Sequence, residues 1–356
     1  MNTDSHRSFH DTERGSTAAD PGSTAVPVES TSYDVVVVGG GAAGLSAATT
    51  LARSLRSVLL VDAGEPRNAP AHAAHNLLGR EGVNPLELLA AGRSEAEAYG
   101  ARIVAAEAVS AAREGEAFAV VLSTGTRVTG RRLLLATGLV DELPDVPGVR
   151  GEWGGRVLHC PYCHGYEVRG QRIGILATTP FAVHQALLFR QLSDTVTVFL
   201  HRIDGFGPEE SAQLAALGVR TVPGPVARVE PEEAGAEHAD DHGSSPLAVV
   251  LAGGERIEVD ALAVGPRMIA RGGLYEQLGG ELSEHPMGRF IETGPMGRTP
   301  IEGVWAAGNS SDLSAMVSVA GGGGTMAAAA INAELALEDA RAAAARTAAC
   351  MAAPTG

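Results

Sequence analysis

The sequence predicts an α/β protein with parallel sheets, and three observations carry this prediction. An apolar run over residues 35–38 leads directly into a glycine-rich turn of the G-x-G-x-x-G type. An alanine-rich, helix-favouring segment follows the turn, and a second apolar run then ends at Asp62. Further apolar runs alternate with helix-favouring segments along the chain, which is typical of parallel strands covered by helices.

Each part of the glycine-rich turn has a task in binding a dinucleotide. Gly39 permits a tight turn, Gly41 lets the backbone approach a pyrophosphate, and Gly44 lets the helix pack closely on the strand. The helix N-terminus attracts phosphate, and Asp62 can accept hydrogen bonds from ribose hydroxyls. We therefore predict a dinucleotide site with contacts from Gly39, Gly41, Ala42, Ala43, Gly44 and Asp62. The alternative is that the glycines serve a turn alone and Asp62 is a solvated strand end.

Length and composition narrow the class of protein. The chain has 356 residues, enough for two domains of ordinary size, and 45% of them are hydrophobic. Its net charge of −15 opposes binding to nucleic acid or to an anionic membrane surface. Residues 1–32 are polar and lack the apolar core of a signal peptide, so we expect a disordered tail and a cytoplasmic protein. No apolar run is long enough to span a bilayer.

The segment HCPYCHGYE, residues 159–167, contains a cysteine pair, Cys160 and Cys163, followed directly by His164. This pattern fits a redox dithiol, half of a zinc site or a haem attachment site. Structural zinc needs four ligands, and the third cysteine, Cys350, stands far along the chain. In a reducing compartment a cysteine pair is usually catalytic or metal-binding. We favour the redox dithiol and expect no metal, while two buried, inert cysteines remain an alternative.

Two further strand ends indicate which dinucleotide is bound. One strand in residues 131–148 ends in Ala136-Thr137-Gly138, and a late strand in residues 301–312 ends in Ala306-Ala307-Gly308-Asn309. With the glycine-rich turn and the cysteine pair, these segments make the chain resemble the flavoprotein pyridine nucleotide-disulfide oxidoreductases. Within that group it is similar to the low-molecular-weight thioredoxin reductases, over roughly residues 33–340.

The resemblance implies two Rossmann-like dinucleotide-binding domains and FAD as the cofactor. The FAD-binding domain would be discontinuous, with residues 33–148 and 284–345, around a central domain of residues 149–283 and before a tail of residues 346–356. The family also implies a homodimer. Towards the C-terminus, the residues themselves predict a flexible glycine run, residues 321–324, before an alanine-rich helix. The residues implied at the cofactor are Ala136, Thr137, Gly138, Gly308 and Asn309, the last of which replaces the family's aspartate.

The same resemblance assigns roles around the cysteine pair. Cys163 would lie nearer the flavin, and Cys160 would exchange with the substrate. His164 is a candidate to take and return the thiol proton, because an unperturbed imidazole titrates near neutral pH. His72 and His75 are candidates for a base on the substrate side, although a histidine in a loop is more often structural.

A second glycine motif, which in the family binds NADPH, is missing. Its three glycine positions fall on Ala177, Thr179 and Ala182, and side chains at the first two obstruct the turn and the approach of a pyrophosphate. The family's basic cluster is altered as well, with Ile203 and Gly207 at two of its basic positions. We therefore predict that this chain does not use NADPH.

Without NADPH, a flavin beside a dithiol needs another electron route. The simplest route has a substrate dithiol reduce the cysteine pair, which reduces FAD, which O₂ then reoxidises to give H₂O₂. In this the chain resembles the thioredoxin-reductase-like dithiol oxidases that close the disulfides of gliotoxin, holomycin and romidepsin. The resemblance implies a small-molecule dithiol and O₂ as partners. A disulfide reductase with NAD(P)H or another electron donor, and a flavin-binding scaffold protein without catalysis, remain alternatives.

Overall fold

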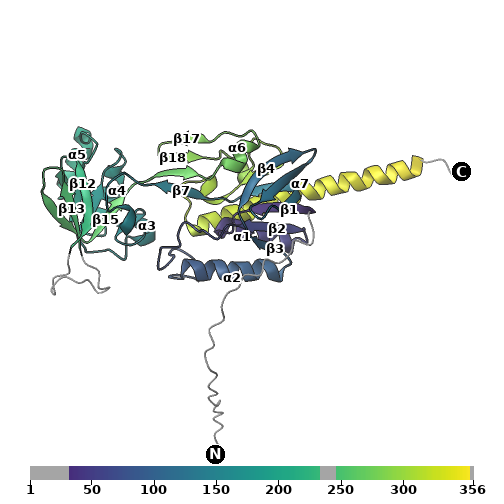
Figure 1. Cartoon of the computed structure of the whole chain (residues 1–356), viewed down its shortest axis with the longest axis horizontal. Helices are drawn as coiled ribbons and strands as arrows, with labels where there is room; N and C mark the ends of the chain where they lie inside the picture. The colour runs from purple at the N-terminus through teal and green to yellow at the C-terminus, as the bar shows by residue number, and fades with distance from the viewer. Residues whose placement is uncertain (1–31, 233–245, 353–356) are drawn as a thin grey trace, which may run out of the picture.

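A computed structural model describes residues 32–232 and 246–352 of the chain. The tail predicted over residues 1–32 lies outside the described residues apart from Ser32, which begins the first strand. The described residues form two α/β units side by side, in agreement with the predicted fold class (Figure 1). None of the helices in the described ranges is both long and apolar enough to cross a bilayer.

The first unit contains the glycine-rich turn. Its main sheet has the order β3-β2-β1-β6-β5-β4, with β19 added beside β6. The strands are β1 (Ser32–Val38), β2 (Val58–Asp62), β3 (Arg102–Ala105), β4 (Ala108–Glu114), β5 (Ala117–Leu122), β6 (Arg127–Leu135) and β19 (Val304–Ala306). β1 and β2 are nearly continuous apolar runs because both faces of a parallel sheet are covered. β19 brings a late segment of the chain beside β6, so this unit is assembled from distant parts of the sequence.

Three long helices cover this sheet. They are α1 (Ala42–Arg53), α2 (Pro85–Ala98) and α7 (Val317–Ala352). α7 contains the glycine run 321–324, so our prediction of a flexible run is wrong, and the physical reason is close packing on α1. A Cβ atom on Gly324 would lie 2.0 Å from the carbonyl oxygen of Ala43, so only glycine permits this approach of the two helices. α7 also continues to Ala352 and projects beyond the sheet, so most of the tail predicted from residue 346 is helical (Figure 1).

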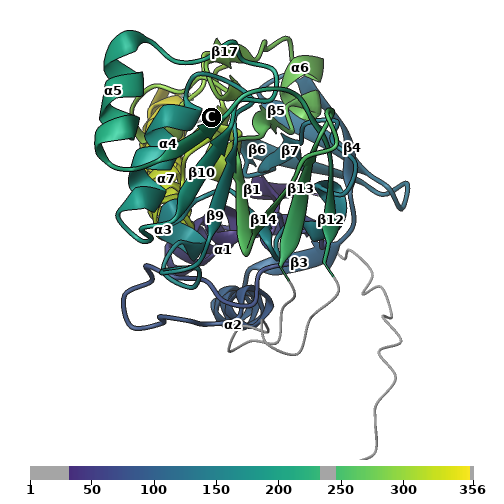
Figure 2. The same cartoon turned by 90° about the vertical axis from the view of Figure 1, so that its left-hand side faces the viewer.

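The second unit contains the cysteine pair. Its parallel sheet has the order β11-β10-β9-β15-β8. The strands are β8 (Val157–Leu158), β9 (Ile173–Leu176), β10 (Val196–Phe199), β11 (Arg220–Val222) and β15 (Ala261–Val264). One face packs on α4 (Ala182–Arg190) and α5 (Pro208–Ala216), and the other on an antiparallel sheet of β12 (Val226–Pro231), β13 (Leu247–Leu251) and β14 (Arg256–Val259). Figure 2 shows these two layers on opposite sides of the central strands.

A small sheet joins the two units. It has the order β17-β18-β16-β7 and consists of β7 (Leu139–Glu142), β16 (Arg267–Ala270), β17 (Ser283–His285) and β18 (Gly288–Phe290). β7 and β16 pair antiparallel, so the two chain crossings between the units run beside each other. After β16, α6 (Gly273–Gln277) buries Leu274 and Tyr275 in the core of the first unit. The predicted central domain extends to residue 283. The buried apolar side chains of α6 nevertheless pack in the core of the first unit.

Short helical turns complete the described structure. They are α3 (Pro161–His164), η1 (Arg150–Glu152), η2 (Pro295–Gly297) and η3 (Gly308–Ser310). α3 directly follows β8, and η3 directly follows β19, so the cysteine pair and the late glycine segment both lie at the carboxyl end of a parallel strand. In open parallel sheets this end of the strands is where ligands bind.

Candidate redox site

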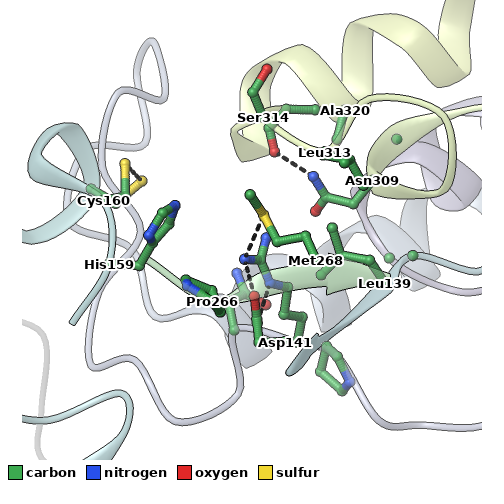
Figure 3. A pocket seen from close by; sticks show the side chains of 18 of the residues that line it. Leu139, Asp141, His159, Cys160, Pro266, Met268, Asn309, Leu313, Ser314 and Ala320 are labelled. Atoms are coloured by element: carbon green, nitrogen blue, oxygen red, sulfur yellow. Dashed lines mark hydrogen bonds and ion pairs between the residues drawn. The ribbon is translucent and has the colours of Figure 1, made fainter. Parts of the chain in front are cut away.

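A cavity of about 1550 Å³ joins the predicted cofactor site to the cysteine pair. Its walls include the glycine-rich turn of the first unit and the cysteine segment of the second unit. Figure 3 shows Cys160 and His159 on one side of this space, with Asn309, Leu313 and Ser314 on the other. The volume exceeds the roughly 300–1,000 Å³ of a typical small-molecule pocket, so it can hold a dinucleotide and still leave room near the sulfur atoms.

The glycine-rich turn has the shape that a bound pyrophosphate requires. Gly39 has a φ of +108°, and a Cβ atom there would lie 2.2 Å from the carbonyl oxygen of Ala136. A Cβ atom on Gly44 would lie 1.8 Å from the carbonyl oxygen of Gly39. Gly41 differs, because a Cβ atom there meets nothing within 4 Å and the residue lines the cavity. Gly39 and Gly44 therefore permit the packing of strand and helix, while Gly41 leaves open the space that a phosphate would enter at the start of α1.

Asp62 lies at the end of β2 and faces the glycine-rich turn. Its carboxylate accepts hydrogen bonds from the backbone N–H groups of Gly40 at 3.2 Å and Gly64 at 3.1 Å. Arg93 of α2 makes an ion pair with the same carboxylate and also lines the cavity. Arg93 was not among the residues predicted from sequence, because nothing local marks which helix residue faces a given strand end. The carboxylate therefore fixes the turn in addition to facing the predicted ribose position.

The two strand-end segments predicted to contact the cofactor also meet at the cavity. The Thr137 hydroxyl donates to the carbonyl oxygen of Arg271 at 2.8 Å, and Gly138 has a φ of +70°, so this segment anchors the crossing between units. Asn309 donates through its amide nitrogen to the carbonyl oxygens of Asp312 and Ala315, both at 3.0 Å. An aspartate could not donate these bonds. This explains in physical terms why an amide is accommodated at position 309.

The cysteine pair is held by a single helical turn. The backbone N–H groups of Cys163 and His164 donate to the carbonyl oxygen of Cys160, at 3.2 and 3.1 Å. The sulfur atoms of Cys160 and Cys163 lie 2.6 Å apart, and the Cys163 thiol donates a hydrogen bond to Cys160. Both cysteines are partly buried and line the cavity. The turn therefore presents two adjacent sulfur atoms to the same space as the cofactor cradle.

The hydrogen bond between the two thiols makes them chemically unequal. Donation from Cys163 lowers the pKa of Cys160 to about 7, against a smaller opposing effect of burial. The same bond, together with burial, raises the pKa of Cys163. Cys160 is thus the group that ionises first, as an attacking or leaving thiolate must.

The difference between the pKa values of the two thiols predicts how the reduced protein reacts with iodoacetamide. In a Cys350→Ser background, the alkylation rate of Cys160 should be half-maximal near pH 7, because the thiolate predominates above its pKa. A Cys163→Ala substitution removes the donated hydrogen bond, so the midpoint should move to higher pH. The measurement is the alkylation rate against pH, followed by mass spectrometry. A midpoint that does not change in Cys163→Ala would contradict this account.

The histidines around the cysteine pair differ in their hydrogen-bond partners. His164 has a buried Nε2 atom without a hydrogen-bond partner among the described residues, and burial lowers the pKa of the ring, which favours its neutral form. His159 donates through Nδ1 to the carbonyl oxygen of Val264 at 3.1 Å, and burial also lowers its pKa. His159 directly precedes Cys160 in the sequence, and the structure shows its side chain beside Cys160 on the cavity wall (Figure 3).

The loop with His72 and His75 packs against the cysteine turn. His75 meets Glu81 through Nδ1 at 2.6 Å and Glu167 through Nε2 at 3.4 Å, so both ring nitrogens face carboxylates. The Asn76 amide donates to the carbonyl oxygen of Tyr162, between the two cysteines, at 2.8 Å. His75 thus has a structural role, as a loop histidine usually does. The hydrogen bond from Asn76 joins this loop to the cysteine turn.

The place of the missing second glycine motif opens into the same cavity. Ala177 is fully buried in the core between β9 and α4, and the Thr178 hydroxyl donates to the carbonyl oxygen of Gly265 at 2.9 Å. The Phe181 side chain, 59% exposed, lines the cavity at the start of α4. His201, retained from the family's basic cluster, is buried and accepts the backbone N–H of Val226 at 3.0 Å. A methyl group therefore fills the first glycine position, and one ring nitrogen of His201 is bonded to the backbone while its Nε2 atom has no partner among the described residues.

The fold and the site together define a class of protein. A cradle for a dinucleotide and an adjacent cysteine pair in one cavity are the parts of an oxidoreductase that exchanges electrons between a bound cofactor and thiols. The family model for "Pyridine nucleotide-disulphide oxidoreductase" matches residues 33–332, and the chain belongs to this family. FAD is therefore its cofactor, as in the flavoproteins of this family, and the glycine-rich turn has the shape that such a dinucleotide requires.

Relatives and solved structures agree with this assignment. The chain is 33% identical over 290 residues to thioredoxin reductase tcpT of Claviceps purpurea, covering 79% of this chain and 87% of the relative. It is 32% identical to thioredoxin reductase sirT of Leptosphaeria maculans, covering 78% and 86%. The crystal structure of HlmI is similar with a TM-score of 0.81 and 43% identity, over 90% of this chain and 97% of HlmI. The predicted thioredoxin-reductase-like α/β fold is thereby confirmed.

Proposed function

We propose that this protein is an FAD-dependent thiol oxidase that converts a small-molecule dithiol into a disulfide, with O₂ as the final electron acceptor. The observation that carries the proposal is the altered nucleotide site of the second unit. Ala177 stands in the core where a glycine is needed, and Ile203 and Gly207 stand at two positions that are basic in the family. Electrons must then enter from the substrate side, where the cysteine pair lines the cavity.

The cysteine pair carries out the exchange in two steps. A substrate thiolate attacks the sulfur of Cys160 in the oxidised pair, and the breaking S–S bond leaves its electron pair on Cys163. The second substrate thiolate then attacks the substrate sulfur of this mixed disulfide, and Cys160 departs as a thiolate. The substrate thus loses two electrons and two protons, which the cysteine pair gains. When bound, FAD supplies the two-electron acceptor whose electrons pass to O₂ and give H₂O₂.

The pKa values of two side chains at the site favour these steps. The lowered pKa of Cys160 makes its thiolate a good leaving group, since a lower thiol pKa speeds departure. His164, neutral and without a partner at Nε2 among the described residues, can accept the proton of a substrate thiol and release it to solvent. The assignment of Cys163 to the flavin side and a homodimer are parts of the proposal that rest on the family resemblance. A cytoplasmic location is a further part, and it rests on the polar character of residues 1–32.

A second candidate function is disulfide reduction with NAD(P)H or another electron donor. It is favoured by the names of relatives such as thioredoxin reductases tcpT and sirT. The two functions share the cofactor and the cysteine pair and differ only in where electrons enter. A direct test must therefore observe the flavin while one electron source at a time is supplied.

The test is an anaerobic titration of the purified flavoprotein, followed by the absorbance of oxidised flavin. We expect a small dithiol to bleach the flavin, and NADPH or NADH to leave it oxidised. Admission of air should restore the absorbance and release H₂O₂. A Cys160→Ser variant is the matched control, because it should bind FAD and fail to bleach with dithiol. Rapid bleaching by NADPH would overturn the proposal in favour of the reductase.

A further inference from the structure

One wall of the cavity is formed by α4 and the residue at its N-cap. The side chains of this wall that line the cavity at regular spacing are Phe181, His184, Gln185 and Leu188. Steps of three and four residues place these side chains on one face of the helix. The face consists of two apolar side chains, an imidazole and an amide, and it contains no carboxylate or guanidinium group.

Hydrogen bonds join this face to the cysteine segment, and α3 contacts α4 (Figure 1). The Gln185 side-chain amide donates to the carbonyl oxygen of His159, the residue before Cys160, at 2.7 Å. The backbone N–H of Gln185 donates to the carbonyl oxygen of Phe181 at 3.3 Å. Phe181 therefore lies about 6 Å along the helix axis from the point where α4 is bonded to the cysteine segment, at roughly 1.5 Å per residue.

Phe181 is exposed although its side chain is large and apolar. It is 59% exposed, whereas the other phenylalanines of the described residues are buried or half-buried. It directly precedes Ala182, the third glycine position of the missing nucleotide motif. Tyr162, between the two cysteines, is also exposed and lines the same cavity. Exposed apolar side chains in a concave site are typical of surfaces that bind a ligand.

We infer that this face of α4 binds the apolar part of the dithiol substrate, with Phe181 as the residue that determines this specificity. The inference rests on the proposed function, in that the ligand is taken to be the dithiol that reduces the cysteine pair. An apolar group that covers the Phe181 ring gains van der Waals contact and removes the ring from water. A charged group would lose hydration against this face without gaining an ion pair from it. The substrate class is therefore a dithiol on an uncharged, apolar frame.

The test measures binding without electron transfer. The probe is ortho-xylylene dithiol with both sulfur atoms methylated, an uncharged aromatic thioether that cannot reduce a disulfide. Isothermal titration calorimetry of the oxidised holoprotein gives its Kd. In Phe181→Ala the Kd should rise about 3- to 10-fold, because the contact with the ring is lost. Phe181→Leu should recover part of this loss, since leucine keeps an apolar contact.

A matched control and a second probe separate specificity from general damage to the cavity. Tyr166 is 65% exposed, and the Arg169 guanidinium lies 4.0 Å from its ring centroid. Tyr166 lies outside the set of described residues that line the cavity, so Tyr166→Ala should leave the Kd unchanged. The second probe is dimercaptosuccinate with both sulfur atoms methylated. It carries carboxylates and should bind the parent protein at least about tenfold more weakly. The FAD content of each variant reports whether the cavity is intact.

Three outcomes would overturn the inference. They are equal binding of the two probes, no binding of the uncharged probe to the parent protein, and an unchanged Kd in Phe181→Ala. If this variant also became bleached by NADPH, Phe181 would serve to exclude a nucleotide instead. The measurement needs neither free thiols nor O₂, so a failed dithiol titration would leave the binding result valid. An unchanged Kd would equally leave the electron route of the proposed oxidase untouched.

Discussion

Cys160→Ser and Cys163→Ser should each lose at least about 1,000-fold of dithiol-dependent turnover while still binding FAD. Without the sulfur of Cys160 no mixed disulfide with the substrate can form. Without Cys163 there is no oxidised pair to open, since the two sulfur atoms, 2.6 Å apart, act as one unit. The measurement is H₂O₂ release from a small dithiol in air, with the flavin absorbance of each variant as the check on cofactor content.

Cys350→Ser is the matched control for these variants. Cys350 is exposed on the projecting end of α7, far along the chain from the cavity, so its loss should leave turnover unchanged. Undiminished turnover in Cys160→Ser would mean that electrons reach the flavin without the pair. Cys160→Ser and Cys163→Ser each remove one sulfur atom of the pair. A loss of turnover in Cys160→Ser but not in Cys163→Ser would therefore indicate a single-thiol mechanism.

Two substitutions in the glycine run of α7 should change the free energy of unfolding in opposite directions. Gly324→Ala should lower the free energy of unfolding by about 1–3 kcal/mol, because its Cβ atom would lie 2.0 Å from the carbonyl oxygen of Ala43. Gly322→Ala should raise it by about 0.5–1 kcal/mol, because Gly322 meets nothing within 4 Å and alanine favours a helix. Denaturant unfolding of both variants measures the difference.

The same pair of substitutions tests whether α7 supports the cofactor. Ala43 lies in the first turn of α1, next to the glycine-rich turn, so a displaced α7 should also weaken FAD retention in Gly324→Ala. Dialysis followed by flavin absorbance measures this retention, with Gly322→Ala as the reference. If both variants gain stability, the close approach of α1 and α7 is not a constraint on this fold.

Local sequence pattern was sufficient for the main parts of this protein. The glycine-rich turn, the apolar strands around it and the end of β2 at Asp62 all come from spacing within one strand–helix–strand segment. The cysteine pair and its histidine are likewise adjacent in sequence, and the structure forms them into one short turn. Such features are predictable because their partners lie within a few residues or one structural repeat, where periodicity and turn chemistry act directly.

Other predictions failed where a distant contact decides the outcome. The run 321–324 is helical because α1 lies against it, although glycine on its own favours flexibility. α6 was assigned to the wrong unit, because its burial of Leu274 depends on strands that lie more than 100 residues earlier. In both cases the free energy of packing outweighs the local preference of the chain.

The charges of the site were determined by the tertiary structure alone. Arg93 and Asp62 are 31 residues apart in the sequence, so no local pattern links this pair. His201 stands at a position of the family's basic cluster, yet in the fold it is buried and accepts the backbone N–H of Val226. The sequence thus determined which cofactor and which sulfur atoms this protein has. The fold determined which charges face them, because electrostatic influence depends on distance in space and on burial rather than on order in the chain.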